Sequence, residues 1–99
     1  AETVPGMRLA ARPNPFNVKT IVEYTVPSAG HVAVRVYELA GRVVRTLVDR
    51  EVRPGEYGIT WDGSTDEGLG AAAGVYFVRM ETSGGDTPFV SARKIVLLR

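Results

Sequence analysis

The alternating stretch Val32–Val48, VAVRVYELAGRVVRTLV, constrains the fold of this chain more than any other segment. Valine occupies every second position of residues 32–36, which is the period-2 pattern of a strand with one buried face. Gly41 lies where the chain must reverse, and only glycine enters positive φ without a Cβ penalty. A second extended run follows from Val43. The stretch therefore predicts two strands joined by a tight turn.

Strands of similar length are predicted along the rest of the chain, because apolar alternation is broken repeatedly by Pro and Gly. The expected strands are a short one within 7–16 and others at 20–26, 31–39, 42–48, 56–61, 75–82 and 87–98. A polar connection is expected at 49–55, a long loop at 62–74 and a turn at 83–86. About seven short strands without helical periodicity are typical of a β-sandwich.

We therefore predict an all-β fold, a seven-strand Ig-like or fibronectin-III-like antiparallel β-sandwich. Its domain covers residues 8–99 and follows a linker at residues 1–7. With 99 residues, the chain is long enough for one core and too short for two. Phe16 is expected to anchor the proline-containing segment that follows the first strand. The predicted core consists of Val22, Tyr24, Val26, Val32, Val34, Val36, Val44, Tyr57, Ile59, Trp61, Tyr76, Val78, Ile95 and Leu97.

Composition excludes several classes of function. Twelve basic and 11 acidic residues give a formal net charge of +1, which argues against nucleic acid or an anionic membrane as partner. The absence of Cys excludes disulfides and thiolate chemistry. No apolar run approaches the roughly 20 residues that a transmembrane helix needs, so no transmembrane segment is predicted.

Catalysis has little support in the sequence. His31 is the single histidine, and a catalytic triad needs a nucleophile, a base and an orienting acid that converge. The serines lie in or near turns or on the last strand, so His31 is expected to be an exposed residue at the start of a strand. We predict that the chain is not an enzyme.

A calcium site is one interpretation of the loop after Trp61. Asp62, Asp66 and Glu67 place carboxylates close together among glycines, and Ca²⁺ favours oxygen ligands on a flexible turn. The alternative, which we favour, is that Asp62 and Asp66 form Asx-turns that order the loop. No other cofactor is predicted.

Two sets of residues, one aromatic and one basic, suit either a binding surface or a structural role. Tyr57, Trp61 and Tyr76 suit a carbohydrate-stacking platform, but a sandwich needs large residues in its core, so core packing is favoured. Tyr37 is the better candidate for an exposed aromatic residue. Five arginines could also form a basic stripe that a partner recognises. We favour the interpretation that they form cross-strand ion pairs with Glu23, Glu38 and Glu81. The arginines concerned are Arg35, Arg42, Arg45, Arg79 and Arg93.

Four local patterns occur in order along the chain. They are Pro13-Asn14-Pro15-Phe16-Asn17; Val36–Val44 (VYELAGRVV); Trp61-Asp62-Gly63 with Asp66 and Gly68; and Gly74–Arg79 (GVYFVR) with Arg93–Leu97 (RKIVL). Together they resemble the C-terminal sorting domains of the type IX secretion system, and also the Ig-like domain of the flagellar hook-capping protein. The resemblance covers roughly residues 9–99.

The resemblance to sorting domains implies a non-enzymatic C-terminal domain of a secreted bacterial protein. Such a domain directs export through the type IX system and attachment to the cell surface, by way of the periplasm and outer membrane. The implied partners are the outer-membrane secretion machinery, a sortase-like peptidase and a cargo domain N-terminal to residue 1. The implied recognition residues are Gly41, Arg42, Arg93 and Lys94.

Two alternatives remain open for the function. One is an Ig-like accessory module of a secreted hydrolase, which binds glycan or spaces domains. The other is an assembly module akin to the flagellar hook cap.

Overall fold

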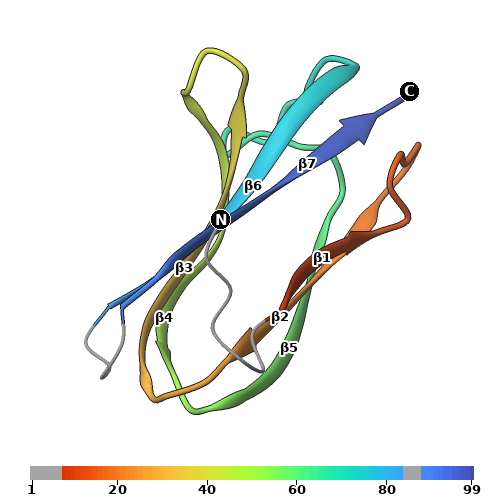
Figure 1. Cartoon of the computed structure of the whole chain (residues 1–99). Coiled ribbons are helices and arrows are strands. Elements are labelled where there is room, and N and C mark those ends of the chain that lie inside the picture. Colours follow the sequence, from red (N-terminus) through yellow and green to blue (C-terminus); the bar gives the residue numbers. More distant parts are fainter. Residues whose placement is uncertain (1–7, 84–87) are drawn as a thin grey trace.

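The computed structural model describes residues 8–83 and 88–99 and contains seven strands (Figure 1). They are β1 (Leu9–Arg12), β2 (Thr20–Val26), β3 (Gly30–Glu38), β4 (Val43–Val52), β5 (Gly55–Trp61), β6 (Gly74–Ser83) and β7 (Val90–Leu97). The predicted linker at residues 1–7 lies outside the described residues. So do most of the predicted turn at 83–86 and the predicted start of the last strand at Thr87.

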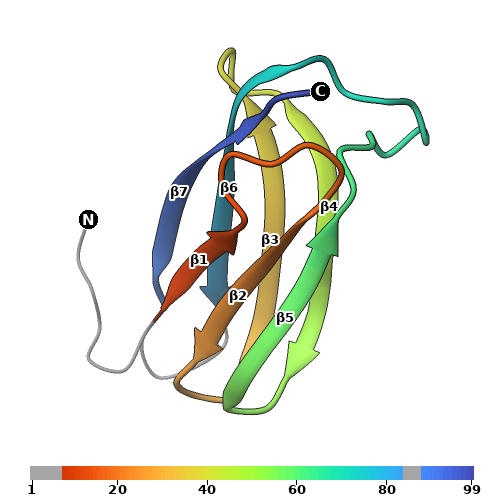
Figure 2. The same cartoon turned by 90° about the vertical axis from the view of Figure 1, so that its right-hand side faces the viewer.

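The strands form two antiparallel sheets. One has the order β1-β2-β5 and the other the order β4-β3-β6-β7. Figure 2 shows the three-stranded sheet lying over the four-stranded sheet, with the core between them. The predicted Ig-like β-sandwich is therefore confirmed. The described part of the chain contains no helix that is both long and apolar enough to span a bilayer.

The core is built from the inward residues of both sheets. Trp61 is fully buried, Phe16 is 1% exposed, and their ring centroids lie 5.5 Å apart. Phe16 is thus the anchor that the sequence predicts. Most predicted core residues are buried, whereas Val44, Tyr57 and Ile59 are only partly buried and pack against the core. Further buried apolar residues were not predicted as core: Leu9, Ala33, Val48, Val52, Ala71 and Met80.

A β-bulge explains the position of Val44. On β3, Val36 pairs with Arg45 and Tyr37 pairs with Val43, so Val44 has no partner in this ladder. A bulge interrupts the alternation of faces, and strict period 2 therefore does not hold through this part of β4.

The fourth strand is longer than the sequence predicts. The expected polar connection at 49–55 is wrong in its first half, because β4 continues to Val52. The polar side chains of Asp49 and Glu51 bind the imidazole of His31 on β3, with N–O distances of 2.5 and 3.5 Å. Val48 and Val52 meanwhile point into the core. These cross-strand side-chain contacts make a polar run suitable for a strand.

The segment after β1 closes the free edge of β7. Phe16 donates its amide to Val96 O at 2.9 Å and accepts from Leu98 N at 2.8 Å. The side-chain amide of Asn14 donates to Lys94 O at 2.8 Å and accepts from Val96 N at 3.0 Å. Asn14 thus replaces a backbone peptide in the ladder, next to two prolines that have no N–H to donate.

The opposite edge of the same sheet is closed in the same way. The amide of Asp66 donates to Val44 O at 2.9 Å, and its carboxylate accepts from Thr46 N at 3.0 Å. Val44 and Thr46 belong to β4, the other edge strand of the four-stranded sheet. An unpaired edge is a template for pairing with other chains, and here a loop residue covers part of each edge.

We expect Asn14→Ala to lower the free energy of unfolding by about 1–2 kcal/mol, because two hydrogen bonds to β7 are lost. Urea denaturation measures the loss, and hydrogen exchange should show faster exchange at the Val96 amide. Asn17→Ala is the matched control, since Asn17 is exposed in the same segment. Equal effects of the two substitutions would contradict the role given to Asn14.

Candidate functional site

The loop between β5 and β6 holds the predicted calcium ligands. The carboxylate of Asp62 accepts from the Ser64 amide at 3.0 Å and from its hydroxyl at 2.5 Å. The bond from the Ser64 hydroxyl is the main reason that the pKa of Asp62 lies below its usual value. Asp62 thus forms the predicted Asx-turn, whereas the carboxylate of Asp66 reaches across to β4.

The loop acidic residues are therefore occupied as hydrogen-bond acceptors or, like Glu67, exposed to solvent. Within residues 8–83 and 88–99, no three His, Asp or Glu side chains gather in a way that would hold a metal ion. The calcium site at Asp62, Asp66 and Glu67 stays a prediction of the sequence.

Arg99 and Trp61 hold the loop against the sandwich. The guanidinium of Arg99 donates to Gly63 O at 2.9 Å, and the indole of Trp61 donates to Ser64 O at 2.8 Å. A Cβ on Gly63 would lie 2.7 Å from Arg99 Nη2. Arg99 was not identified from the sequence, because Gly63 lies 36 positions before it and no local pattern joins the two.

The predicted recognition residues do not form one site. Gly41, at φ 92°, and Arg42 lie in the β3–β4 turn, where Arg42 binds both oxygens of Glu38 at 3.0 and 3.3 Å. Arg93 and Lys94 lie on β7 and are adjacent in sequence, so their side chains leave opposite faces of the strand. Arg93 pairs with inward Val78, and Lys94 pairs with outward Phe77.

The aromatic residues considered for carbohydrate stacking serve mainly in packing. Trp61 and Tyr76 meet edge to face with centroids 5.4 Å apart, and both are buried. Tyr57 is half-buried and stacks on Tyr24 at 5.5 Å. The core-packing interpretation is confirmed for Trp61 and Tyr76.

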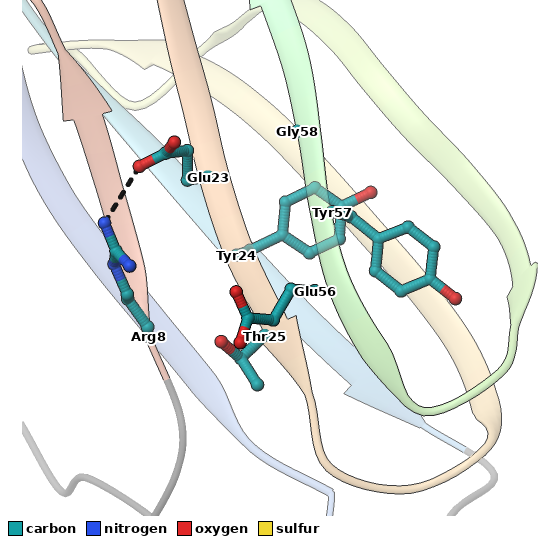
Figure 3. Close-up of a pocket in the computed structure, with 7 residues that line it drawn as sticks. All are labelled: Arg8, Glu23, Tyr24, Thr25, Glu56, Tyr57 and Gly58. Atoms are coloured by element: carbon teal, nitrogen blue, oxygen red, sulfur yellow. Dashed lines mark hydrogen bonds and ion pairs between the residues drawn. The ribbon is translucent and has the colours of Figure 1, made fainter.

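A shallow hollow lies on the three-stranded sheet (Figure 3). Gly58 pairs with Glu23 across β2 and β5 and contributes no side chain to the lining of the hollow. Glu23 accepts from Arg8 at 2.9 Å and also from Arg12. The bond from Arg12 is the main reason that the pKa of Glu23 is lowered, so Glu23 is a poor proton acceptor near neutral pH.

Three arginines of the suspected basic stripe are paired with carboxylates, but only Arg35 forms the predicted cross-strand pairs, because Arg79 pairs within β6 and Arg42 pairs within the β3–β4 turn. Arg35 lies 3.4 Å from Asp49 and 3.8 Å from Glu81, and Arg79 lies 2.8 Å from Glu81. Arg45 instead donates to Thr65 O at 3.0 Å, and Arg93 donates to the neighbouring Ala92 O. The stripe is therefore a set of ion pairs and loop contacts.

Five apolar residues lie close together at one end of the outer face of the four-stranded sheet, and Leu39 lies in the adjoining β3–β4 turn. We call these six the apolar patch: Tyr37, Leu39, Val43, Val75, Phe77 and Val96. Tyr37 pairs with Phe77 on one side and Val43 on the other, and Val75 pairs with Val96. Leu39 is 70%, Val43 46% and Phe77 36% exposed. A patch of this kind suits protein binding.

A profile of the family described as FlgD Ig-like domain matches residues 17–86. The chain is 36% identical over 63 residues to the basal-body rod modification protein FlgD of Salmonella typhimurium, and equally to that of Salmonella typhi. It is 34% identical over 64 residues to FlgD of Escherichia coli. The first match covers 64% of this chain and 27% of the relative, so the chain spans about a quarter of the curated relatives.

Two solved structures share the fold. The dimeric latent PorU of Porphyromonas gingivalis superposes with a TM-score of 0.76 and 21% identity, over 93% of this chain and 9% of PorU. FlgD of Xanthomonas campestris superposes with a TM-score of 0.60 and 22% identity, over 89% of this chain and 60% of that chain. At these identities the similarity shows the fold alone.

The relatives overturn the predicted partners. An outer-membrane type IX machinery and a sortase-like peptidase were expected, and this is wrong, because the matching relatives are FlgD proteins. The motifs resemble both families, and the resemblance to the hook-capping Ig-like domain is confirmed. They do not separate the two families because several of their residues serve the fold. Asn14 closes an edge, Gly41 makes a turn and Trp61 fills the core, so such residues do not discriminate between functions.

We expect Gly63→Ala to destabilise the domain by about 1–2 kcal/mol, because φ is 79° there and the new Cβ would push against Arg99. Gly58→Ala is the matched control. Its Cβ would meet Ile21 Cγ2 at an ordinary 3.6 Å, so its stability should change by less than about 1 kcal/mol. Thermal and urea unfolding measure both, and a neutral Gly63→Ala would refute the packing of Arg99 against the loop.

Glu23 should contribute to acid sensitivity. Its pKa is lowered in the folded state, so its stabilisation is present above the unfolded value of about 4.3 and is lost as the pH falls through the folded value. Urea midpoints measured from about pH 6 to 2 should fall less for Glu23→Gln than for the wild type. Arg12→Gln should flatten the profile in the same way. Unchanged profiles in both variants would contradict this origin of the shift.

Proposed function

Because the chain belongs to the family of FlgD Ig-like domains, we propose that it is a structural, non-enzymatic assembly module of a flagellar hook-capping protein. One observation carries the proposal: the family profile runs over residues 17–86, from the end of the edge-closing segment through β6. The Xanthomonas campestris FlgD structure is described in terms of hook capping essential for flagellar assembly. This role is the flagellar assembly module that the sequence analysis left open as an alternative. A protein with this role works outside the cell.

The geometry supports a role in holding and binding. Two carboxylates, those of Glu23 and Asp66, are held in place by an arginine and by a backbone amide, respectively. Both edges of the four-stranded sheet are partly covered, which limits unspecific strand pairing. A module with these properties suits repeated copies packed closely together, as in an appendage.

A domain exchange tests the proposal. The Ig-like segment of Salmonella typhimurium FlgD is replaced by residues 8–99 in a strain that lacks FlgD, and swimming and hook assembly are scored. We expect the chimera to restore measurable hook assembly and motility. The matched control is the same exchange with the PorU segment that superposes on this chain, which shares the fold and should fail.

Immunoblots of the exported fraction must first show that both chimeras are stable and exported. A stable chimera that forms no hooks would count against the flagellar role. Equal rescue by the PorU segment would show that the fold alone suffices and would also contradict the proposal.

A further inference from the structure

We propose that the apolar patch binds an apolar segment of a partner protein that carries carboxylates at its flank. The proposal rests on the assembly role above, since it takes the domain to be a binding module. It names the surface and the chemistry of the partner. The patch lies on β3, β4, β6 and β7 near the end of the sandwich that holds the β3–β4 turn (Figure 1).

The patch is two neighbouring rows of side chains across the sheet. One row contains Val43, Tyr37 and Phe77, with Lys94 paired to Phe77 at its end. The other contains Val75 and its partner Val96. The opposite faces of these strands fill the core, where Val36 and Val78 are fully buried. The outer residues are therefore not needed to complete the sandwich.

The charge beside the apolar rows is net positive, because Asp49 and Glu81 offset Arg35 and Arg79 and Lys94 adds one further positive charge. Arg35 and Arg79 pair with each other in the next row of the sheet, and Lys94 closes the end of the first row. Arg79 also lies over the ring of Tyr37, 5.9 Å from its centroid. The carboxylates of Asp49 and Glu81 lie one row further from the patch, on either side of Ala33.

This arrangement selects an acidic partner by charge complementarity. A carboxylate beside an apolar segment would meet Lys94 or Arg79 as the segment covers Phe77. Tyr and Arg are also the residue types that most often dominate binding energy at interfaces, and Tyr37 and Arg79 occur here in contact.

A second copy of this chain is a poorer occupant. In a twofold interface the same patch meets itself. The border of the patch has the same net positive charge in both copies, because Lys94 remains after Asp49 and Glu81 offset Arg35 and Arg79, and like charges repel. Glu38, the acid nearest the β3–β4 turn, is already bound to Arg42.

The test is a selection of random 16-residue peptides displayed on phage, with the immobilised 99-residue chain as bait. We expect enriched peptides that combine apolar residues with Asp or Glu. Synthetic copies of these peptides should bind the Phe77→Ser variant at least about ten-fold more weakly than they bind the wild-type chain. Binding to the Val90→Ser variant should be unchanged, since Val90 is also exposed on this face but lies two rows from the patch. A selection on Lys94→Glu should enrich basic peptides instead.

Circular dichroism and urea midpoints confirm that each variant is folded before its binding is compared. The proposal fails if no saturable peptide is enriched, if the peptides bind Phe77→Ser and Val90→Ser alike, or if acidic residues are not enriched. It also fails if sedimentation shows wild-type dimers that Phe77→Ser dissolves, because the occupant is then a second copy. A failed domain exchange with a successful selection would refute only the flagellar role, and the reverse result would refute only this surface.

Discussion

The hydrogen bonds that close the two edges of the four-stranded sheet are the constraint on which the rest of the structure depends. Asn14 satisfies β7 and Asp66 satisfies β4, each with a side-chain group in the place of a backbone peptide. Both closing segments must be held firmly to do this. Phe16 therefore enters the core beside Trp61, and the indole of Trp61 in turn binds the loop that carries Asp66. One aromatic cluster thus supports both edges.

The same arrangement explains why short motifs did not separate the two families that they resemble. A proline-flanked asparagine, a glycine turn and a tryptophan followed by aspartate are what this way of closing a sandwich requires. Residues that serve this closure carry no information about what the domain binds. Discrimination between functional groups therefore depends on similarity spread over the domain, which the FlgD profile measures across residues 17–86.

The alternation of valines predicted most strands and most of the core, because burial of one face of a strand is a local, periodic property. What the sequence did not show depends on partners far apart in the chain. The extension of β4 relies on His31 from another strand, and Asn14 and Val96 are 82 positions apart. Phe77 could be placed opposite the buried face by period 2, but its position beside Tyr37 follows only from the strand order β4-β3-β6-β7.

Closed edges and a neutralised ion-pair network leave the apolar patch as the main adhesive feature of the four-stranded sheet. The binding free energy that this patch can supply is limited. Complete burial of an apolar side chain contributes about 1.5–3 kcal/mol, and Phe77 is already mostly covered. Association itself costs at least about 4 kcal/mol, so one domain should hold its partner weakly. In an assembly that presents several copies, effective concentration raises the combined affinity by a factor of about 100 or more. Weak single contacts then allow subunits to be exchanged, while the assembly as a whole stays attached.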